Sequence, residues 1–184
     1  MHELKKVREA EYFLQRMSSE LDSREAFLSD LSAFLAAARS VLQYAQEEAR
    51  QKKGGQAWYE AQANSHHLMK FFKDKRDLNI HSEPVDASSA VEIEVKDEAV
   101  CPSESLTVTV FDLQGNVVDQ STTATPPVSK SARPRESQMS VTYRHYFADW
   151  KGKDDVMTLA GRYLTELKAF VADGQSKGFL SRPT

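Results

Sequence analysis

The feature that most constrains the fold is a double change of hydrophobic period along the chain. Apolar residues recur at three- and four-residue steps up to about residue 82, alternate with polar residues from Val91, and return to helical spacing from Val156. The first spacing is typical of one helix face, and alternation is typical of a strand. The pattern predicts a mainly α protein of the α+β class. We expect a four-helix bundle with a small antiparallel sheet inserted between helices three and four.

Four helical segments are indicated. Asp22 and Glu25 have the spacing of a capping box, which predicts that the second helix starts there. Gly54-Gly55 ends that helix, and a third begins near Trp58. The third helix must stop at or before Glu83, because the proline that follows disfavours helical geometry in the residue before it. The buried face of the fourth helix would take Val156, Leu159, Ala160, Tyr163, Leu164, Leu167, Phe170 and Val171.

The intervening region is predicted to be strand-rich. The stretches "VEIEV", "LTVTVF" and "SVTYRHYF" read as strands, and Gly115-Asn116 as a hairpin turn. Residues 119–139 have few large apolar side chains, so we expect a mobile loop there. The organisation expected is a single domain over 1–184, with the helical bundle in 1–82 and 152–175 and the β-rich insertion at about 90–148. The alternative is a helical domain followed by a separate α+β domain.

Composition narrows the function classes. The net charge of -3 gives no overall attraction for nucleic acid, so any such binding needs a local basic patch. No apolar stretch is long enough to span a membrane, and the charged start of the chain lacks the apolar core of a secretory signal. We therefore expect a cytoplasmic protein with no membrane partner. Cys101 is the single cysteine, which excludes a disulfide within one chain.

One local basic cluster stands out. Lys70, Lys73, Lys75 and Arg76 lie within seven positions, near the predicted end of the third helix. Such a cluster either complements the negative end of the helix dipole or binds phosphate. Arg39 stands among core candidates in "AAARSV", so it either reaches a carboxylate across the bundle or faces a functional groove.

The sequence lacks the motifs of most known catalytic mechanisms, and no cofactor is predicted. There is no Gly-rich phosphate loop and no exposed-serine elbow. The adjacent pair His66-His67 would point about 100° apart on a helix, so we expect no metal site there. His145 lies in a predicted strand and is expected to be a structural or cross-strand partner.

The stretch "RDLNIH" contains Arg76, Asp77 and His81, an Arg-x4-His spacing with a polar residue directly after the arginine. With three helical segments before it, this pattern resembles the HEPN superfamily (higher eukaryotes and prokaryotes nucleotide-binding). The order of "YFL", "AFLAAARSV", "WY" and "LMKFFKDKRDLNIH" is also similar to that in small bacterial proteins, a likeness that implies no activity.

The resemblance implies a metal-independent endoribonuclease. His81 would exchange a proton with a ribose 2′-hydroxyl or a leaving 5′-oxygen, and Arg76 would stabilise charge on the phosphate. Asp77 would orient either side chain by hydrogen bonding. Members of the superfamily commonly build this site at a dimer interface, so a homodimer is implied. Lys70, Lys73 and Lys75 are the candidate RNA-binding residues.

The alternative is a HEPN-like binding or interaction module without turnover, whose partner is a nucleotide, RNA or another protein. In that case Arg76 pairs with a nearby carboxylate, while His81 and Asn79 help to end the helix. The carboxylates of Asp74 and Asp77, close to Arg76, would also repel an approaching phosphate backbone.

Overall fold

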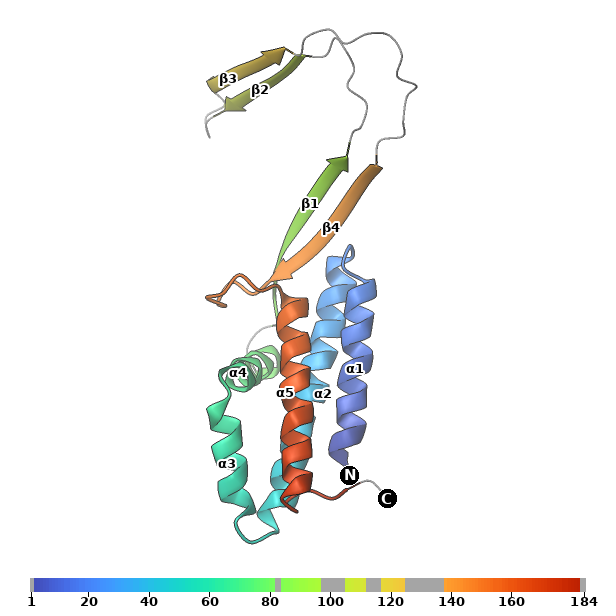
Figure 1. Cartoon of the computed structure of the whole chain (residues 1–184), viewed down its shortest axis with the longest axis vertical. Helices are drawn as coiled ribbons and strands as arrows, with labels where there is room; N and C mark the ends of the chain where they lie inside the picture. The colour runs from blue at the N-terminus through green and yellow to red at the C-terminus, as the bar shows by residue number, and fades with distance from the viewer. Residues whose placement is uncertain (1, 82–83, 97–104, 112–116, 125–137, 183–184) are drawn as a thin grey trace. The chain divides into compact units, whose positions relative to one another are not determined.

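The structure is a computed structural model of the chain. It describes residues 2–81, 84–96, 105–111, 117–124 and 138–182, and side chains for 2–79, 84–94 and 140–182. The chain divides into two compact units, one formed by residues 1–92 with 143–184 and the other by 93–142. The elements follow one another along the chain as drawn in Figure 1. They are α1 (His2–Ser19), α2 (Arg24–Arg50), α3 (Gly55–Ser65), α4 (His67–His81), β1 (Ser88–Lys96), β2 (Ser105–Phe111), β3 (Val117–Ala124), β4 (Gln138–Tyr146) and α5 (Val156–Ser176).

The predicted fold class is confirmed. The protein is mainly helical, and its strands are inserted ahead of the last helix, where the sequence placed them. The insertion expected at about 90–148 corresponds to the second unit together with the strand ends that join it to the first. That residues 1–184 form one domain stays a prediction.

The first unit is built around the apolar face of α2. In Figure 1, α1 and α5 run alongside α2, and α4 contacts both α2 and α5. The ring of Phe72 from α4 lies parallel to that of Tyr163 from α5, with centroids 4.5 Å apart, and Phe34 from α2 meets both edge-on. These rings are fully buried, so they fix α4 against the other helices.

Two helix predictions are corrected. The expected third helix is two helices, α3 and α4, because His66 adopts an extended conformation with φ -107° and ψ 107°. The second helix does start at the predicted place, at Arg24, but without a capping box between Asp22 and Glu25, since Ser23 is the N-cap and its side chain makes no cap hydrogen bond. α5 does have a side-chain cap, because the carboxylate of Asp155 accepts from the backbone N–H of Thr158 at 2.7 Å.

The second unit contains an antiparallel pair. β2 pairs with β3 in a register that joins Ser105 to Ala124, and the predicted turn Gly115-Asn116 lies outside the described residues. Residues 119–124 belong to β3, so the prediction of a loop over 119–139 is wrong for this part. The ladder between backbones needs no large apolar side chains, and the β-branched residues Thr122 and Thr123 suit a strand. Residues 125–137 lie outside the described residues.

The base of the inserted strands is anchored in the first unit by His145. Its ring is buried, and it stacks on Phe27 with centroids 3.9 Å apart. Nδ1 lies 3.0 Å from the hydroxyl of Ser89 in β1, and Nε2 lies 2.9 Å from the carbonyl oxygen of Leu21. Because that carbonyl can only accept, Nε2 donates to it, and Nδ1 shares a hydrogen bond with the hydroxyl of Ser89. His145 is therefore a structural and cross-strand residue, as predicted.

Candidate functional site

Helix α4 carries most of the residues that the sequence analysis singled out. Leu68, Met69 and Phe72 are buried and hold one side of the helix in the core. Lys70 and Lys73 are one turn apart on the exposed part of α4. Because these core contacts fix which side of α4 is buried, they also determine which of its basic residues can line the same pocket.

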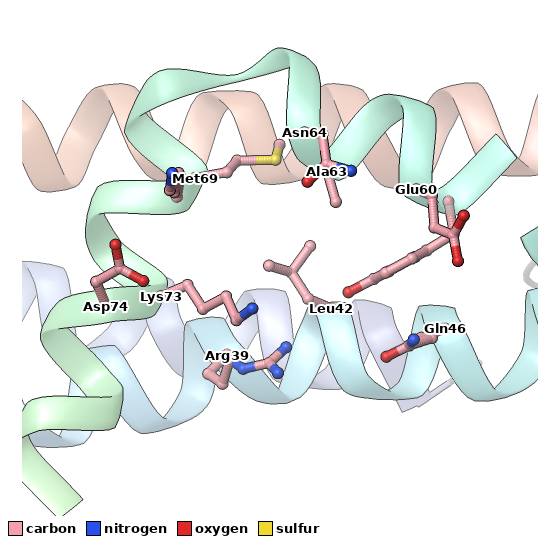
Figure 2. Close-up of a pocket in the computed structure, with 11 residues that line it drawn as sticks. Arg39, Leu42, Gln46, Glu60, Ala63, Asn64, Met69, Lys73 and Asp74 are labelled. Atoms are coloured by element: carbon pink, nitrogen blue, oxygen red, sulfur yellow. The ribbon is translucent and has the colours of Figure 1, made fainter. Parts of the chain in front are cut away.

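Lys70 and Lys73 share a pocket with residues from α2 and α3. The pocket has a volume of about 440 Å³, within the usual range for small-molecule sites. Figure 2 shows side chains from α2, α3 and α4 around it. Its lining consists of Arg39, Leu42, Gln46, Tyr59, Glu60, Ala63, Asn64, Met69, Lys70, Lys73 and Asp74.

Arg39 is the innermost cation of this pocket. Its side chain is partly buried, and its Nε is fully buried without a hydrogen-bond partner. Among the residues that the structure describes, no carboxylate forms an ion pair with it. Of the two alternatives that the sequence left open, the groove-facing one is therefore observed, and the pairing with a carboxylate across the bundle is not.

Two tyrosines adjoin the guanidinium of Arg39. Burial raises the pKa of Tyr59, and the positive charge of Arg39 lowers it in part. Burial also raises the pKa of Tyr163, again opposed by Arg39. Both phenols are therefore neutral near pH 7 and do not compensate the charge of Arg39. A neutral hydroxyl can accept a hydrogen bond from the arginine but cannot neutralise it.

Two cations of the pocket, Arg39 and Lys73, point toward each other (Figure 2). Figure 2 shows Lys73 extending from α4 toward Arg39 on α2, whereas Gln46 and Glu60 lie at the opposite end. No ion pair involves Lys70 or Lys73 within the described part of the chain, and Glu60 accepts a hydrogen bond from Gln56 at 2.6 Å. Cations that point toward each other repel, and a bound anion between them would remove that repulsion.

Arg76 and Asp77, two of the predicted catalytic residues, are joined by a hydrogen bond between their side chains. Nη1 of Arg76 donates to Oδ1 of Asp77 at 3.1 Å, while Nε of Arg76 is buried without a partner in the described structure. The backbone of α4 is helical as far as His81, whose side chain lies outside the described residues. Five helical steps rotate a position by about 140°, so Arg76 and His81 occupy different sides of α4. This geometry does not favour their pairing within one chain.

Asn79 secures the chain that follows α4. Its Nδ2 donates to the hydroxyl of Ser32 at 2.8 Å, and its Oδ1 accepts from the backbone N–H of Val85 at 2.9 Å. The non-catalytic alternative assigned a role of this kind to Asn79 and a carboxylate pairing to Arg76, and both contacts are present.

Lys75 is not brought together with the other two lysines. Its Nζ lies 2.6 Å from Oδ1 of Asp149, and its side chain is only 11% exposed. Nζ also lies over the ring of Phe147, 4.9 Å from its centroid. Because this cation is already paired and covered, its observed contacts are structural.

Neither a metal-binding cluster nor a membrane-spanning helix is present among the described residues. The described residues contain no group of three or more His, Cys, Asp or Glu side chains placed to hold a metal ion. His66 lies 3.7 Å from Glu166, and His67 adjoins the ring of Trp150. No helix in the described ranges is sufficiently long and apolar to cross a membrane.

Comparison with known family models, with curated proteins and with solved structures gave no match.

Proposed function

We propose that this protein binds RNA or a nucleotide through phosphate, in the pocket formed by Arg39, Lys70 and Lys73. This is the non-catalytic, HEPN-like binding function. The observation that carries it is the convergence of Arg39 and Lys73 in one pocket, with no carboxylate paired to either among the described residues.

The chemistry of the three side chains suits phosphate. An arginine presents a planar fork that can donate two hydrogen bonds to phosphate oxygens, and the two lysines add mobile point charges at the rim. Glu60 and Asp74 also line the pocket and reduce its net charge to one positive unit. Asp74 lies at the Lys73 end and Glu60 at the opposite end in Figure 2, so binding depends on the three cations outnumbering the two carboxylates. A local surplus of this kind fits a protein whose overall charge is negative.

Fluorescence anisotropy with a labelled single-stranded RNA tests this proposal. Arg39→Gln and Lys73→Gln should each weaken binding. Each should also make the slope of log affinity against log salt concentration shallower by about 0.7, which corresponds to the loss of one phosphate contact on single-stranded RNA. Lys151→Gln is the charge-matched control, since Lys151 is exposed and lines none of the described pockets. The proposal is wrong if the wild-type protein binds neither RNA nor a nucleotide, or if all three variants weaken binding equally.

A second proposal is metal-independent RNA cleavage, with Arg76, His81 and Asp77 as catalytic residues at a homodimer interface. The observation in its favour is the guanidinium of Arg76, whose side chain is 20% exposed and whose ion pair in the described structure is with the neighbouring Asp77. Since Arg76 and His81 lie on different sides of α4, a composite site would need one residue from each chain.

The cleavage proposal is tested by incubating RNA with the purified protein in EDTA. Arg76→Ala and His81→Ala should each abolish cleavage, with Lys151→Gln as the active control. Light scattering at micromolar concentration should then show a dimer. Cleavage that survives both alanine substitutions, or no cleavage by the wild type, would exclude this role while leaving phosphate binding intact.

A further inference from the structure

We infer that the pocket takes a terminal phosphomonoester, the group that ends a mononucleotide or a phosphorylated RNA strand, rather than an internal phosphodiester. This inference rests on the proposed phosphate-binding function and specifies its ligand class. It follows from the depth of Arg39, the three cationic donors of the pocket and the space beside them.

Depth is the first argument. Nε of Arg39 has no solvent exposure, and the arginine is less exposed than Lys70 and Lys73, which lie at the rim. A phosphate that reaches the guanidinium must therefore enter the pocket. An internal diester carries a nucleoside on each side and would bring both into about 440 Å³. A monoester has one substituent and presents its free oxygens first.

The number of acceptor oxygens also favours a monoester. A phosphomonoester carries about -1.5 to -2 charges at pH 7 and three acceptor oxygens. The pocket offers three cations, Arg39 from α2 and Lys70 and Lys73 from α4, so each terminal oxygen can accept from a separate cation. A diester has only two free oxygens, and would leave one of these cations without an oxygen to bind.

The rest of the lining accommodates the single substituent. Leu42 and Met69 contribute apolar surface, and the amides of Gln46 and Asn64 can each donate and accept hydrogen bonds. Gln46 lies at the end opposite Lys73 in Figure 2. One end of the pocket thus suits the phosphate and the other suits a sugar or base.

The test compares ligands that differ only in their terminal phosphate. Short RNAs with a 5′-phosphate or a 5′-hydroxyl, and a second pair differing at the 3′ end, are titrated by anisotropy with the label at the other end. Adenosine 5′-monophosphate and adenosine are compared by calorimetry to separate a free nucleotide from an RNA end. We expect the terminal phosphate to strengthen binding at least about tenfold in one of these pairs, which charge-assisted hydrogen bonds are able to supply.

Variants distinguish failure of this inference from failure of the proposed function. Lys73→Gln and Arg39→Gln should abolish the advantage of the terminal phosphate, and Lys151→Gln should retain it. Lys73 is exposed, so its variant keeps the test valid if Arg39→Gln fails to fold. If phosphorylated and hydroxyl ligands bind equally well, and both pocket variants lose this binding, the monoester inference is wrong and phosphate binding still holds. If no ligand binds, or if neither variant changes the affinity, both the monoester inference and the proposed phosphate-binding function are wrong.

Discussion

Replacing Gly174 by alanine should destabilise the protein, although alanine is the better helix former. A Cβ atom at Gly174 would lie 2.6 Å from Cη2 of Trp58 and 2.7 Å from Cγ and Cδ1 of Leu180. Trp58 cannot easily move aside, because its indole N–H donates to Asp173 at 2.7 Å and its ring stacks on Phe170. Leu180 is buried as well, at 2% exposure.

The magnitude follows from two opposing effects. Overpacking of a filled core by one methyl group costs about 1–3 kcal/mol. Replacing glycine by alanine within a helix returns up to about 1 kcal/mol, and less near a helix end such as Gly174. The net destabilisation should be about 1–2 kcal/mol, which lowers the Tm of a chain of this size by roughly 2–8 °C.

Gly161 provides a matched control on the same helix. A Cβ there would meet no atom within 4 Å, so Gly161→Ala should stabilise the protein by about 0.5–1 kcal/mol through helix propensity alone. Urea unfolding followed by circular dichroism at 222 nm measures both variants. A Gly174→Ala protein as stable as the wild type, or equal destabilisation by the two substitutions, would refute the packing around Trp58.

Two further predictions concern charged residues. Lys75→Gln should cost about 0.5–1 kcal/mol of stability, because it removes the ion pair with Asp149, while RNA affinity stays unchanged; an affinity loss equal to that of Lys73→Gln would contradict this. Hydrogen bonds from Trp58 and Lys177 hold the pKa of Asp173 below its usual value. The stability from this carboxylate is present above its unfolded pKa and is lost as the pH falls through the folded value. Asp173→Asn should therefore make urea stability fall less steeply below about pH 4, and an unchanged acid slope would count against it.

Hydrophobic period was a reliable guide where one helix face is buried along its whole length. Every residue predicted for the buried face of the last helix, from Val156 to Val171, is buried in α5. The reason is physical: α5 packs along α1, α2 and α4, so its apolar stripe is covered from end to end. Hydrophobic period did not predict the strand at residues 119–124. β3 is stabilised there by backbone pairing, and a stretch of polar residues shows no apolar alternation from which a strand could be predicted.

The three lysines of α4 show how far helical geometry alone can assign residues to a surface. Lys70 and Lys73 differ by three positions and fall on neighbouring faces, whereas Lys75 is rotated by about 200° from Lys73. The sequence therefore held the signal that Lys75 belongs to another surface, although not that Asp149 would pair with it. Spacing in the sequence also cannot reveal that Arg39 forms no ion pair with a carboxylate of the described residues, because its neighbours come from distant segments.

The pocket itself depends on a break that periodicity did not predict. In one straight helix, Glu60 and Lys73 would be about 20 Å apart along the axis, at 1.5 Å for each of 13 steps. Both line a single pocket of about 440 Å³, because the extended residue His66 lets α3 and α4 take separate directions. No glycine or proline marks that position. The break is therefore set by packing, since Met69 and Phe72 of α4 and Trp58 and Tyr59 of α3 must all reach the same core. Periodicity can predict which residues are buried, but the pocket arises where two such segments cannot remain collinear.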